Sequence, residues 1–283
     1  MKYNKSTQYR IPTLSDLPEP LKGSIIAPNT PISNCLILLH GLGGSHIPFA
    51  RLARHLNLPE TVCISLCGLK QTPLVDLCDD EAGSWHWGSD LTFDDDGIVS
   101  DDADLQKAIE ILEILCKTLT DPLPLGCGFV SQAIFFLGYG QGGRLALNFT
   151  LTQSKPESPH FNKRFGGVLS IGGIVESFDS FSHLFLNESL STQTNEMNNN
   201  TNNKEDHIKN TSCVISRLTT PILLCGGDDE SRITSQTIQQ LSKIFYQVEH
   251  IIWKDHDGDT MPRNRKEWYP LLQWFSQHLL HTF

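Results

Sequence analysis

A glycine-rich stretch, Gly138-Tyr139-Gly140-Gln141-Gly142-Gly143, has the spacing of a motif that carries nucleophilic chemistry. It follows an apolar run at 133–137 and leads into a run typical of a helix. A strand, a sharp turn and a helix in this order form a nucleophile elbow, Gly-x-Ser-x-Gly, whose serine attacks an acyl carbon. Here the central residue is Gly140. The stretch therefore predicts the backbone of an elbow without its hydroxyl, or else an ordinary glycine-rich turn between a strand and a helix.

A second stretch has the composition of a loop that stabilises negative charge. The apolar run 34–40 ends in Gly41-Leu42-Gly43-Gly44-Ser45. When such a loop precedes an elbow in the chain, it supplies one backbone N–H to an oxyanion hole, and the residue after the nucleophile supplies the other. These two donors are predicted to be Leu42 and Gln141.

Acidic residues and a histidine follow the elbow in the order expected of a catalytic triad. The apolar run 221–225 ends in Gly226-Gly227-Asp228-Asp229-Glu230, and a later loop contains His256. A carboxylate at a strand end can orient a histidine, which then acts as the general base. A solvated acidic loop and a surface histidine are the alternative interpretation.

Three of these stretches together resemble the acyl-protein thioesterases and the related carboxylesterases and lysophospholipases of the α/β-hydrolase fold. They are 40–45, 138–143 and 224–228, and the resemblance extends from about residue 24 to about residue 280 without an Asn-rich segment. It implies a Ser-His-Asp hydrolase that acts on acyl esters or thioesters, and a possible acyl ligand or lipidated protein as partner.

The triad departs from this family at each of its three positions. Gly140 replaces the serine, and Glu230 falls at the position of the acid, with Asp228 and Asp229 as neighbouring candidates. Alignment on the last helix places Met261 at the position of the histidine, because Gly258-Asp259-Thr260-Met261 matches the Gly-x-x-His spacing of the family. Alignment on the last strand leaves His256 as the alternative.

Loss of the nucleophile predicts a protein that is inactive by the serine route, since removing a triad residue lowers the rate by several powers of ten. The alternative is an active ester or thioester hydrolase that uses a non-standard nucleophile such as Ser45, or water activated by His256. Trp85 and Trp87, on a polar excursion before the elbow, are candidates for an acyl pocket or for plain packing.

The elements that must position these residues alternate between strands and helices. Apolar runs at 34–40, 62–66, 133–137, 167–171, 221–225 and 248–253 predict strands. Amphipathic runs, such as 105–119 and 267–280, predict helices. This alternation predicts an α/β fold, with a doubly wound, mostly parallel sheet and helices on both faces. We expect an N-terminal arm at 1–23 and a single domain at 24–283 with a low-complexity insertion at about 187–212.

Composition restricts the partners. The 283 residues carry a net charge of −10, which argues against nucleic acid as a partner. No apolar run is long enough to span a membrane. Without a signal peptide, the eight cysteines are predicted to be reduced thiols in a cytoplasmic protein. No metal or cofactor is expected: Asp94-Asp95-Asp96-Gly97 does not complete an EF-hand loop, and Gly41-x-Gly43-Gly44 does not complete a dinucleotide fingerprint.

Overall fold

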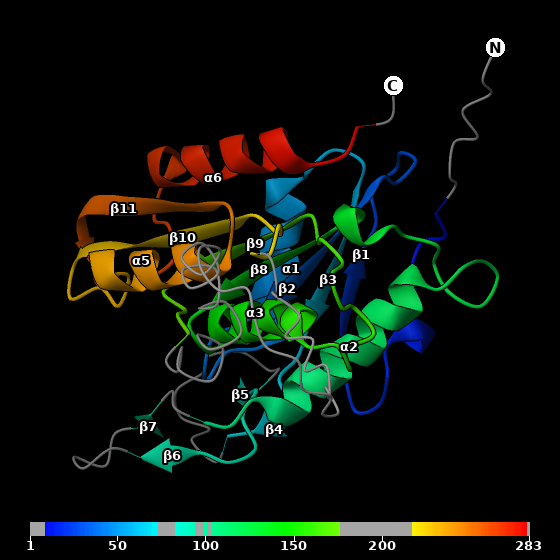
Figure 1. Ribbon diagram of the computed structural model, residues 1–283, viewed down its shortest axis with the longest axis horizontal. Helices are drawn as coiled ribbons and strands as arrows, with labels where there is room; N and C mark the ends of the chain where they lie inside the picture. The colour runs from blue at the N-terminus through cyan, green and yellow to red at the C-terminus, as the bar shows by residue number, and fades with distance from the viewer. Residues whose placement is uncertain (1–8, 73–82, 94–98, 101–102, 176–216, 282–283) are drawn as a thin grey trace, which may run out of the picture.

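The computed structural model describes residues 9–72, 83–93, 99–100, 103–175 and 217–281. The predicted insertion at 187–212 and the acidic run Asp94-Asp95-Asp96 lie outside these ranges. Figure 1 shows the described chain as a central sheet with helices packed against it.

A seven-stranded sheet forms the centre of the molecule, in the order β1-β3-β2-β8-β9-β10-β11 (Figure 1). β1 pairs antiparallel with β3, and the other neighbouring strands are parallel. The strands are β1 (Gly23–Ile26), β2 (Asn34–Leu39), β3 (Thr61–Leu66), β8 (Ile134–Tyr139), β9 (Gly167–Ile171), β10 (Ile222–Asp229) and β11 (Val248–Asp257). The predicted doubly wound, mostly parallel sheet is confirmed.

Two short ribbons come from the polar excursion before the elbow. In the first, β4 (Lys70–Gln71) pairs with β5 (Trp85–His86), and in the second, β6 (Thr92–Phe93) pairs with β7 (Val99–Ser100). They lie apart from the main sheet, near the bottom of Figure 1. The first ribbon matters for the site because it carries Trp85.

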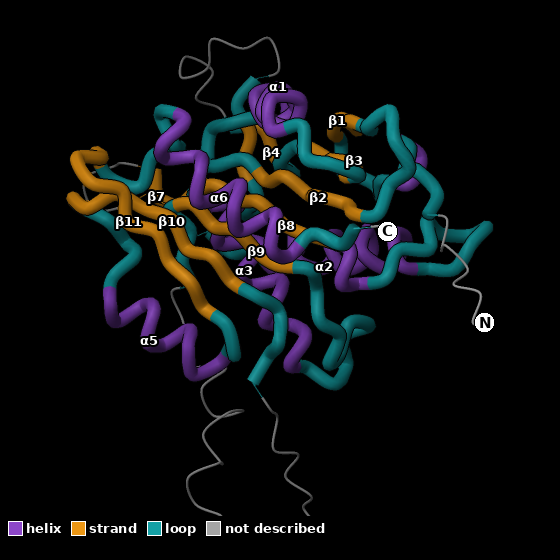
Figure 2. The backbone as a smooth tube through the Cα atoms, turned by 90° about the horizontal axis from the view of Figure 1, so that it is seen from above, coloured by secondary structure: helices purple, strands orange, loops and turns teal. Residues whose placement is uncertain are grey.

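Helices cover both faces of the sheet, as Figure 2 shows from above. α1 and α6 pack on one face, and α2, α3 and α5 pack on the other. The helices are α1 (His46–Leu56), α2 (Gln106–Thr120), α3 (Gln141–Leu151), α5 (Ser235–Ile244) and α6 (Arg265–His278), with 3-10 turns η1 (Leu14–Asp16), η3 (Ser131–Ala133) and η4 (Thr152–Ser154).

Alternation along β2 explains why its sequence is apolar throughout. Leu36 and Leu38 face the cluster formed with α1 and α6, whereas Cys35, Ile37 and Leu39 face the cluster formed with α2, α3 and α5. A parallel strand covered on both faces has no side that favours polar residues. The carboxyl end of this strand is therefore held rigidly where the predicted oxyanion loop begins.

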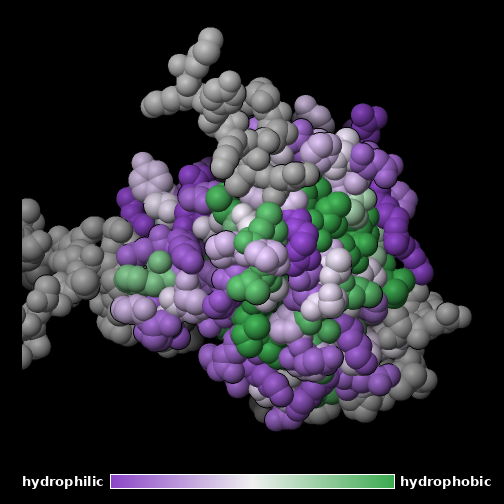
Figure 3. All heavy atoms as spheres, turned by 90° about the vertical axis from the view of Figure 1, so that its right-hand side faces the viewer, coloured by the Kyte–Doolittle hydropathy of each residue, from purple (hydrophilic) through white to green (hydrophobic). Residues whose placement is uncertain are grey.

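The described part of the N-terminal segment packs against the sheet domain. Arg10 donates through its backbone N–H to Cys127 O (3.0 Å) and through Nε to Gly126 O (3.2 Å). Exposed apolar side chains on this segment and on the loop after α2 include Leu14 and Leu125. Figure 3 views the side of the molecule where these two segments lie in Figure 1, and apolar residues form part of that surface.

Candidate functional site

The elbow has the predicted strand, sharp turn and helix. β8 ends at Tyr139, α3 begins at Gln141, and Gly140 between them has φ 49° and ψ −116°. A residue with a Cβ rarely adopts this positive φ, whereas glycine does so without a clash. The backbone that would present a nucleophile is therefore present, and its central position carries no side chain.

Neighbouring glycines allow the strand and the helix to approach closely. A Cβ on Gly138 would lie 2.4 Å from the backbone of Gly142, and a Cβ on Gly142 would lie 2.3 Å from Leu39 O. Neither position has room for a side chain. By contrast, a Cβ on Gly140 would come no closer than 3.9 Å to the described residues beyond its chain neighbours, at Gly41 Cα. Space is thus available at Gly140 alone among these three glycines.

The predicted oxyanion loop begins beside this space, at Gly41, and is hydrogen-bonded to the first ribbon. Gly43 N–H donates to Trp85 O, and Trp85 N–H donates to Gly44 O, both at 2.9 Å. The Ser84 hydroxyl donates to Gly43 O at 3.0 Å. Leu42 stands at the centre of this turn, so its predicted role as a backbone donor is compatible with a fixed loop.

His40 supports the loop as a neutral side chain. Its Nδ1 lies 2.7 Å from Gly41 O, and its Nε2 accepts from Gly68 N–H at 2.8 Å. Because a ring nitrogen that accepts carries no proton, Nδ1 is the protonated donor. Burial lowers the pKa of His40 to about 4. His40 therefore holds the loop in place and has no ring nitrogen free to act as a base.

Trp87 joins the loop to the elbow. Its indole N–H donates to His40 O at 2.8 Å, and its backbone N–H donates to Gln141 Oε1 at 2.7 Å. The side chain is 1% exposed. Both of its donors thus serve the scaffold, and the predicted pocket role of Trp87 remains a prediction. Trp85, with Lys22 Nζ 5.9 Å above its ring, is half-buried and keeps exposed surface.

The acidic residues after β10 have separate surroundings. Asp228 accepts from His256 N–H at 3.2 Å and from Asp255 N–H at 3.1 Å. These backbone hydrogen bonds lower the pKa of Asp228. Glu230 is exposed and has φ 48°, and Asp229 is exposed as well. Asp228 therefore connects β10 to β11 by accepting from backbone N–H groups, and these hydrogen bonds do not involve an imidazole ring.

His256 is buried at the end of β11, and its ring contacts residues other than the predicted acids. Its Nε2 lies 2.8 Å from Thr260 Oγ1, and its Nδ1 lies 3.3 Å from Glu267 Oε2. The ring packs on Trp253 with centroids 4.9 Å apart. The carboxylate beside this histidine is therefore Glu267, on α6, which spacing alone did not identify as a site residue.

Glu267 is held by several donors. Arg263 donates to it from the backbone N–H at 2.6 Å and from Nε at 3.2 Å, and Asn264 Nδ2 donates at 3.0 Å. Burial acts to raise the pKa of Glu267, but the hydrogen bonds and charge of Arg263 lower it to about 2. The carboxylate is therefore ionised and fixed in orientation beside His256.

Met261, at the position predicted for the family's histidine, is half-buried and packs against the cluster formed with α1 and α6. Its thioether offers no proton for acid–base chemistry. Whether this position or His256 corresponds to the histidine of the triad stays a prediction. Within the described residues, the hydrogen bonds of the His256 ring are with Thr260 and not with the predicted acids.

Asp259 lies beside two glycines of the central sheet region, a position that the spacing of the motifs did not indicate. A Cβ on Gly172 would be 2.6 Å from Asp259 Cβ, and a Cβ on Gly226 would be 2.3 Å from Asp259 Oδ1. Its oxygens accept from Ser231 Oγ at 2.6 Å and from Arg232 N–H at 2.8 Å. A carboxylate thus lies beside Gly172 and Gly226, near the carboxyl ends of β9 and β10. Gly172 directly follows Ile171, whose carbonyl accepts from Gly140 N–H at 2.8 Å.

The alternative nucleophile, Ser45, has a structural contact. It is buried and caps α1, where its Oγ accepts from Ile47 N–H at 3.4 Å. Ser84 is also engaged, since its hydroxyl accepts from Thr72 Oγ1 at 2.6 Å. Within the described residues, neither hydroxyl forms a hydrogen bond with an imidazole or a carboxylate that would act as its base.

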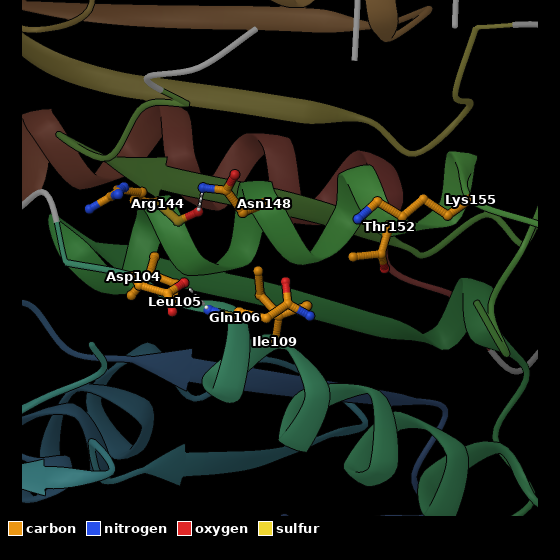
Figure 4. Close-up of a pocket in the computed structure, with 8 residues that line it drawn as sticks. All are labelled: Asp104, Leu105, Gln106, Ile109, Arg144, Asn148, Thr152 and Lys155. Carbon is orange, nitrogen blue, oxygen red and sulfur yellow. Dashed lines mark hydrogen bonds between the residues drawn. The ribbon is translucent and has the colours of Figure 1, made fainter. Parts of the chain in front are cut away.

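A groove of about 210 Å³ opens between α2 and α3 on the opposite face of the sheet from α6. Figure 4 shows polar side chains from both sides, among them Asp104, Arg144 and Asn148, and the hydrogen bond from Asn148 Nδ2 to Arg144 O. None of the residues predicted for the site lines this groove. Within the described ranges, no helix is long and apolar enough to cross a membrane, and no three His, Cys, Asp or Glu residues form a group that fits a metal ion.

Comparisons with known proteins agree with the motifs. The sequence profile of the phospholipase/carboxylesterase family matches residues 22–193. An uncharacterized hydrolase of Schizosaccharomyces pombe is 30% identical over 274 residues, which cover 94% of this chain and 91% of that protein.

Among solved structures, maize acyl-protein thioesterase 2 superposes with a TM-score of 0.56 at 14% identity, covering 91% of this chain and 98% of the other. The Bacillus cereus carboxylesterase superposes with a TM-score of 0.55 at 13% identity, covering 92% and 96%. At these identities the two structures show that the fold is shared.

Proposed function

The chain belongs to the phospholipase/carboxylesterase family of the α/β-hydrolase fold, and we propose that its elbow binds an acyl ester or thioester without cleaving it by the serine route. The observation that carries the proposal is the conformation of Gly140. Its backbone keeps the positive φ of an elbow, and a Cβ placed on it would have open space. Such a site retains what binding requires and lacks the hydroxyl that would form an acyl-enzyme.

The surroundings of Gly140 support the binding of a carbonyl group. The N-terminus of α3 follows Gly140 directly, and its first backbone N–H groups have no acceptor within the helix. The loop at Leu42 is fixed above them by its hydrogen bonds to Trp85. Fixed donors of this kind stabilise negative charge on an oxygen whether or not a reaction follows. Trp85 offers apolar surface for the carbon chain.

A second departure supports the loss of the serine route. The alignment on α6 places Met261 where the family has its histidine, and the hydrogen bonds of His256 are to Thr260 rather than to the elbow. Restoring a serine alone would then supply a nucleophile without its base. A lipidated protein as the source of the acyl group, and a cytoplasmic location, are further parts of this proposal that rest on the resemblance to the family and on composition.

Binding can be measured with a stable analogue. We would titrate the protein with a palmitoyl thioether, which has no cleavable acyl bond, and a palmitoyl thioester, and follow heat by calorimetry. The Gly140→Leu variant fills the space above Gly140, and the Gly140→Ala variant imposes the same backbone strain with a smaller side chain. We expect the wild type and Gly140→Ala to bind the thioester, and Gly140→Leu to bind it at least tenfold more weakly.

Two results would overturn the proposal. The first is binding of the thioester that Gly140→Leu leaves unchanged, because the ligand would then lie elsewhere. The second is release of free thiol from the thioester by wild-type protein with acyl transfer to Ser45, which would establish the alternative of an active hydrolase with a non-standard nucleophile.

A further inference from the structure

The groove between α2 and α3 carries charges of opposite sign on its two walls. Asp104 stands before α2 on one wall, and Arg144 and Lys155 stand on the other, in α3 and directly after η4. Among the described residues, Asp104 forms no ion pair with either cation. A molecule that reaches both walls would therefore meet one carboxylate and two cations.

The charged side chains are spread along the groove rather than gathered at one point. In Figure 4, Arg144 and Asp104 lie at one end, and Lys155 lies at the other with its side chain extended back along α3. The Asp104 carboxylate accepts from Gln106 N–H at 2.9 Å and from Ser89 Oγ at 3.4 Å. These donors hold the carboxylate at the start of α2, on the wall that faces the cations.

The amide groups between these charges present hydrogen-bond acceptors. Gln106 Nε2 donates to Glu110 Oε1, and Asn148 Nδ2 donates to Arg144 O, both at 2.9 Å. Within the described residues, neither amide oxygen accepts a hydrogen bond. The middle of the groove therefore suits a ligand that brings N–H donors, and an ammonium group has three of them.

We propose that this groove binds an acidic α-amino acid of the size of glutamate. One carboxylate of the ligand pairs with Arg144 and the other with Lys155, while the ammonium group donates to Asp104 and to Gln106 Oε1. The three charges of the ligand are thus opposite in sign to those of the three charged side chains. A guanidinium has five N–H donors and an ammonium three, so each cation can hold a ligand oxygen in addition to a partner within the chain.

The size and floor of the groove limit the ligand to a small molecule. Its volume of about 210 Å³ corresponds to roughly seven water molecules. Leu105 and Ile109 are buried beneath it and offer apolar contact to the methylene groups of the ligand. None of these residues belongs to the elbow, and the inference does not depend on the function proposed for Gly140.

Three ligands test the match of charges in the wild-type chain. We would titrate the full chain by calorimetry, at low and constant ionic strength, with L-glutamate, with L-glutamine, which lacks the second carboxylate, and with glutarate, which lacks the ammonium group. Each missing group removes a hydrogen bond between charged partners. We therefore expect glutamine and glutarate each to bind at least about tenfold more weakly than glutamate.

Two variants assign these differences to side chains. Lys155→Gln should bind glutamate no better than glutamine, because the partner of the second carboxylate is lost. Asp104→Asn keeps an oxygen for Gln106 N–H, so α2 still begins with a cap, and it should bind glutamate no better than glutarate. Lys266→Gln is the matched control, since Lys266 is exposed on α6, and it should keep the preferences of the wild type.

The ligand series decides the proposal even where a variant fails to fold. Absence of glutamate binding at millimolar concentration would overturn it. Glutarate that binds the wild type as tightly as glutamate would also overturn it, because the groove would then attract anions without reading the ammonium group. Equal weakening by Lys155→Gln and Lys266→Gln would mean that net charge, rather than the groove, attracts the ligand.

Discussion

Gly140 faces Gly41 across the elbow, and a Cβ built on Gly140 would stop 3.9 Å short of Gly41 Cα. Two glycines thus meet where the enzymes of this fold hold a serine against the oxyanion loop. The local packing accepts a small side chain at this point, and the barrier to one is the positive φ of the backbone. The absence of a hydroxyl is therefore a property of one residue in a backbone that keeps the geometry of an elbow.

The cost of a side chain at Gly140 should be moderate. We predict that Gly140→Ala lowers the free energy of unfolding by about 1–3 kcal/mol, the range for a residue held in sparsely populated φ and ψ. Gly142→Ala should cost more, because its Cβ would lie 2.3 Å from Leu39 O. Urea denaturation of both variants measures the difference, and equal losses would show that the space above Gly140 is not open.

The bridge formed by Trp87 should stabilise the site. Trp87→Phe keeps an aromatic ring but removes the indole N–H that His40 O accepts. A buried carbonyl left without its donor costs about 1–3 kcal/mol. The matched change, Trp85→Phe, removes an indole N–H from a half-buried ring and should cost less. If both variants unfold at the same urea concentration, the role assigned to Trp87 is incorrect.

Acidic pH should lower the free energy of unfolding because His40 is buried in its neutral form. Burial lowers the pKa of His40 to about 4, so the unfolded chain binds a proton at higher pH than the folded chain does. Stability is therefore complete above the unfolded value of about 6.5 and declines as pH falls toward 4, by up to about 3 kcal/mol. His46, His86 and His160 are shifted in the same direction by burial.

The pH dependence can be assigned with a variant. His40→Gln has no titrating group, so its unfolding free energy should change less between pH 7 and pH 5 than that of the wild type. Glu267, whose pKa is lowered to about 2, contributes stability that is lost only below about pH 4.5. Identical slopes for the wild type and His40→Gln between pH 7 and pH 5 would contradict this assignment.

The position of Asp259 leaves no room for a side chain at Gly172. That glycine has φ 67°, and an added Cβ would lie 2.6 Å from Asp259 Cβ. We predict that Gly172→Ala displaces the loop that carries Asp259 and destabilises the protein by more than Gly140→Ala does. Unfolding by urea measures both. A smaller loss for Gly172→Ala would mean that Asp259 does not occupy the ends of β9 and β10.

Much of the scaffold follows from local patterns in the sequence. The amphipathic run at 105–119 predicts a helix, and α2 spans Gln106–Thr120. The glycines at 138, 140 and 142 predict the elbow. Gly138 and Gly142 allow the strand and the helix to approach closely, and Gly140 adopts the positive φ of the turn between them. Such features depend on neighbouring residues, so spacing alone reveals them.

Other parts of the site depend on contacts between distant segments. The pairing of His256 with Glu267 requires the turn between β11 and α6, and spacing gave two competing alignments there. Asp259 reaches its place through Gly172 and Gly226, on two other strands. Trp87 is buried against His40 and Gln141, a contact that its position on a polar excursion did not indicate.

The central claim is that the protein does not act as a serine hydrolase, because Gly140 leaves the elbow without a nucleophile. The most direct test treats the wild type, Gly140→Ala, Gly140→Ser and the double variant Gly140→Ser with Met261→His with a fluorophosphonate probe, followed by peptide mapping. We predict no label on the peptide that contains residue 140 in the wild type or in Gly140→Ala, and clear labelling of the new serine in the double variant. Robust labelling of a wild-type serine, such as Ser45, would contradict the account.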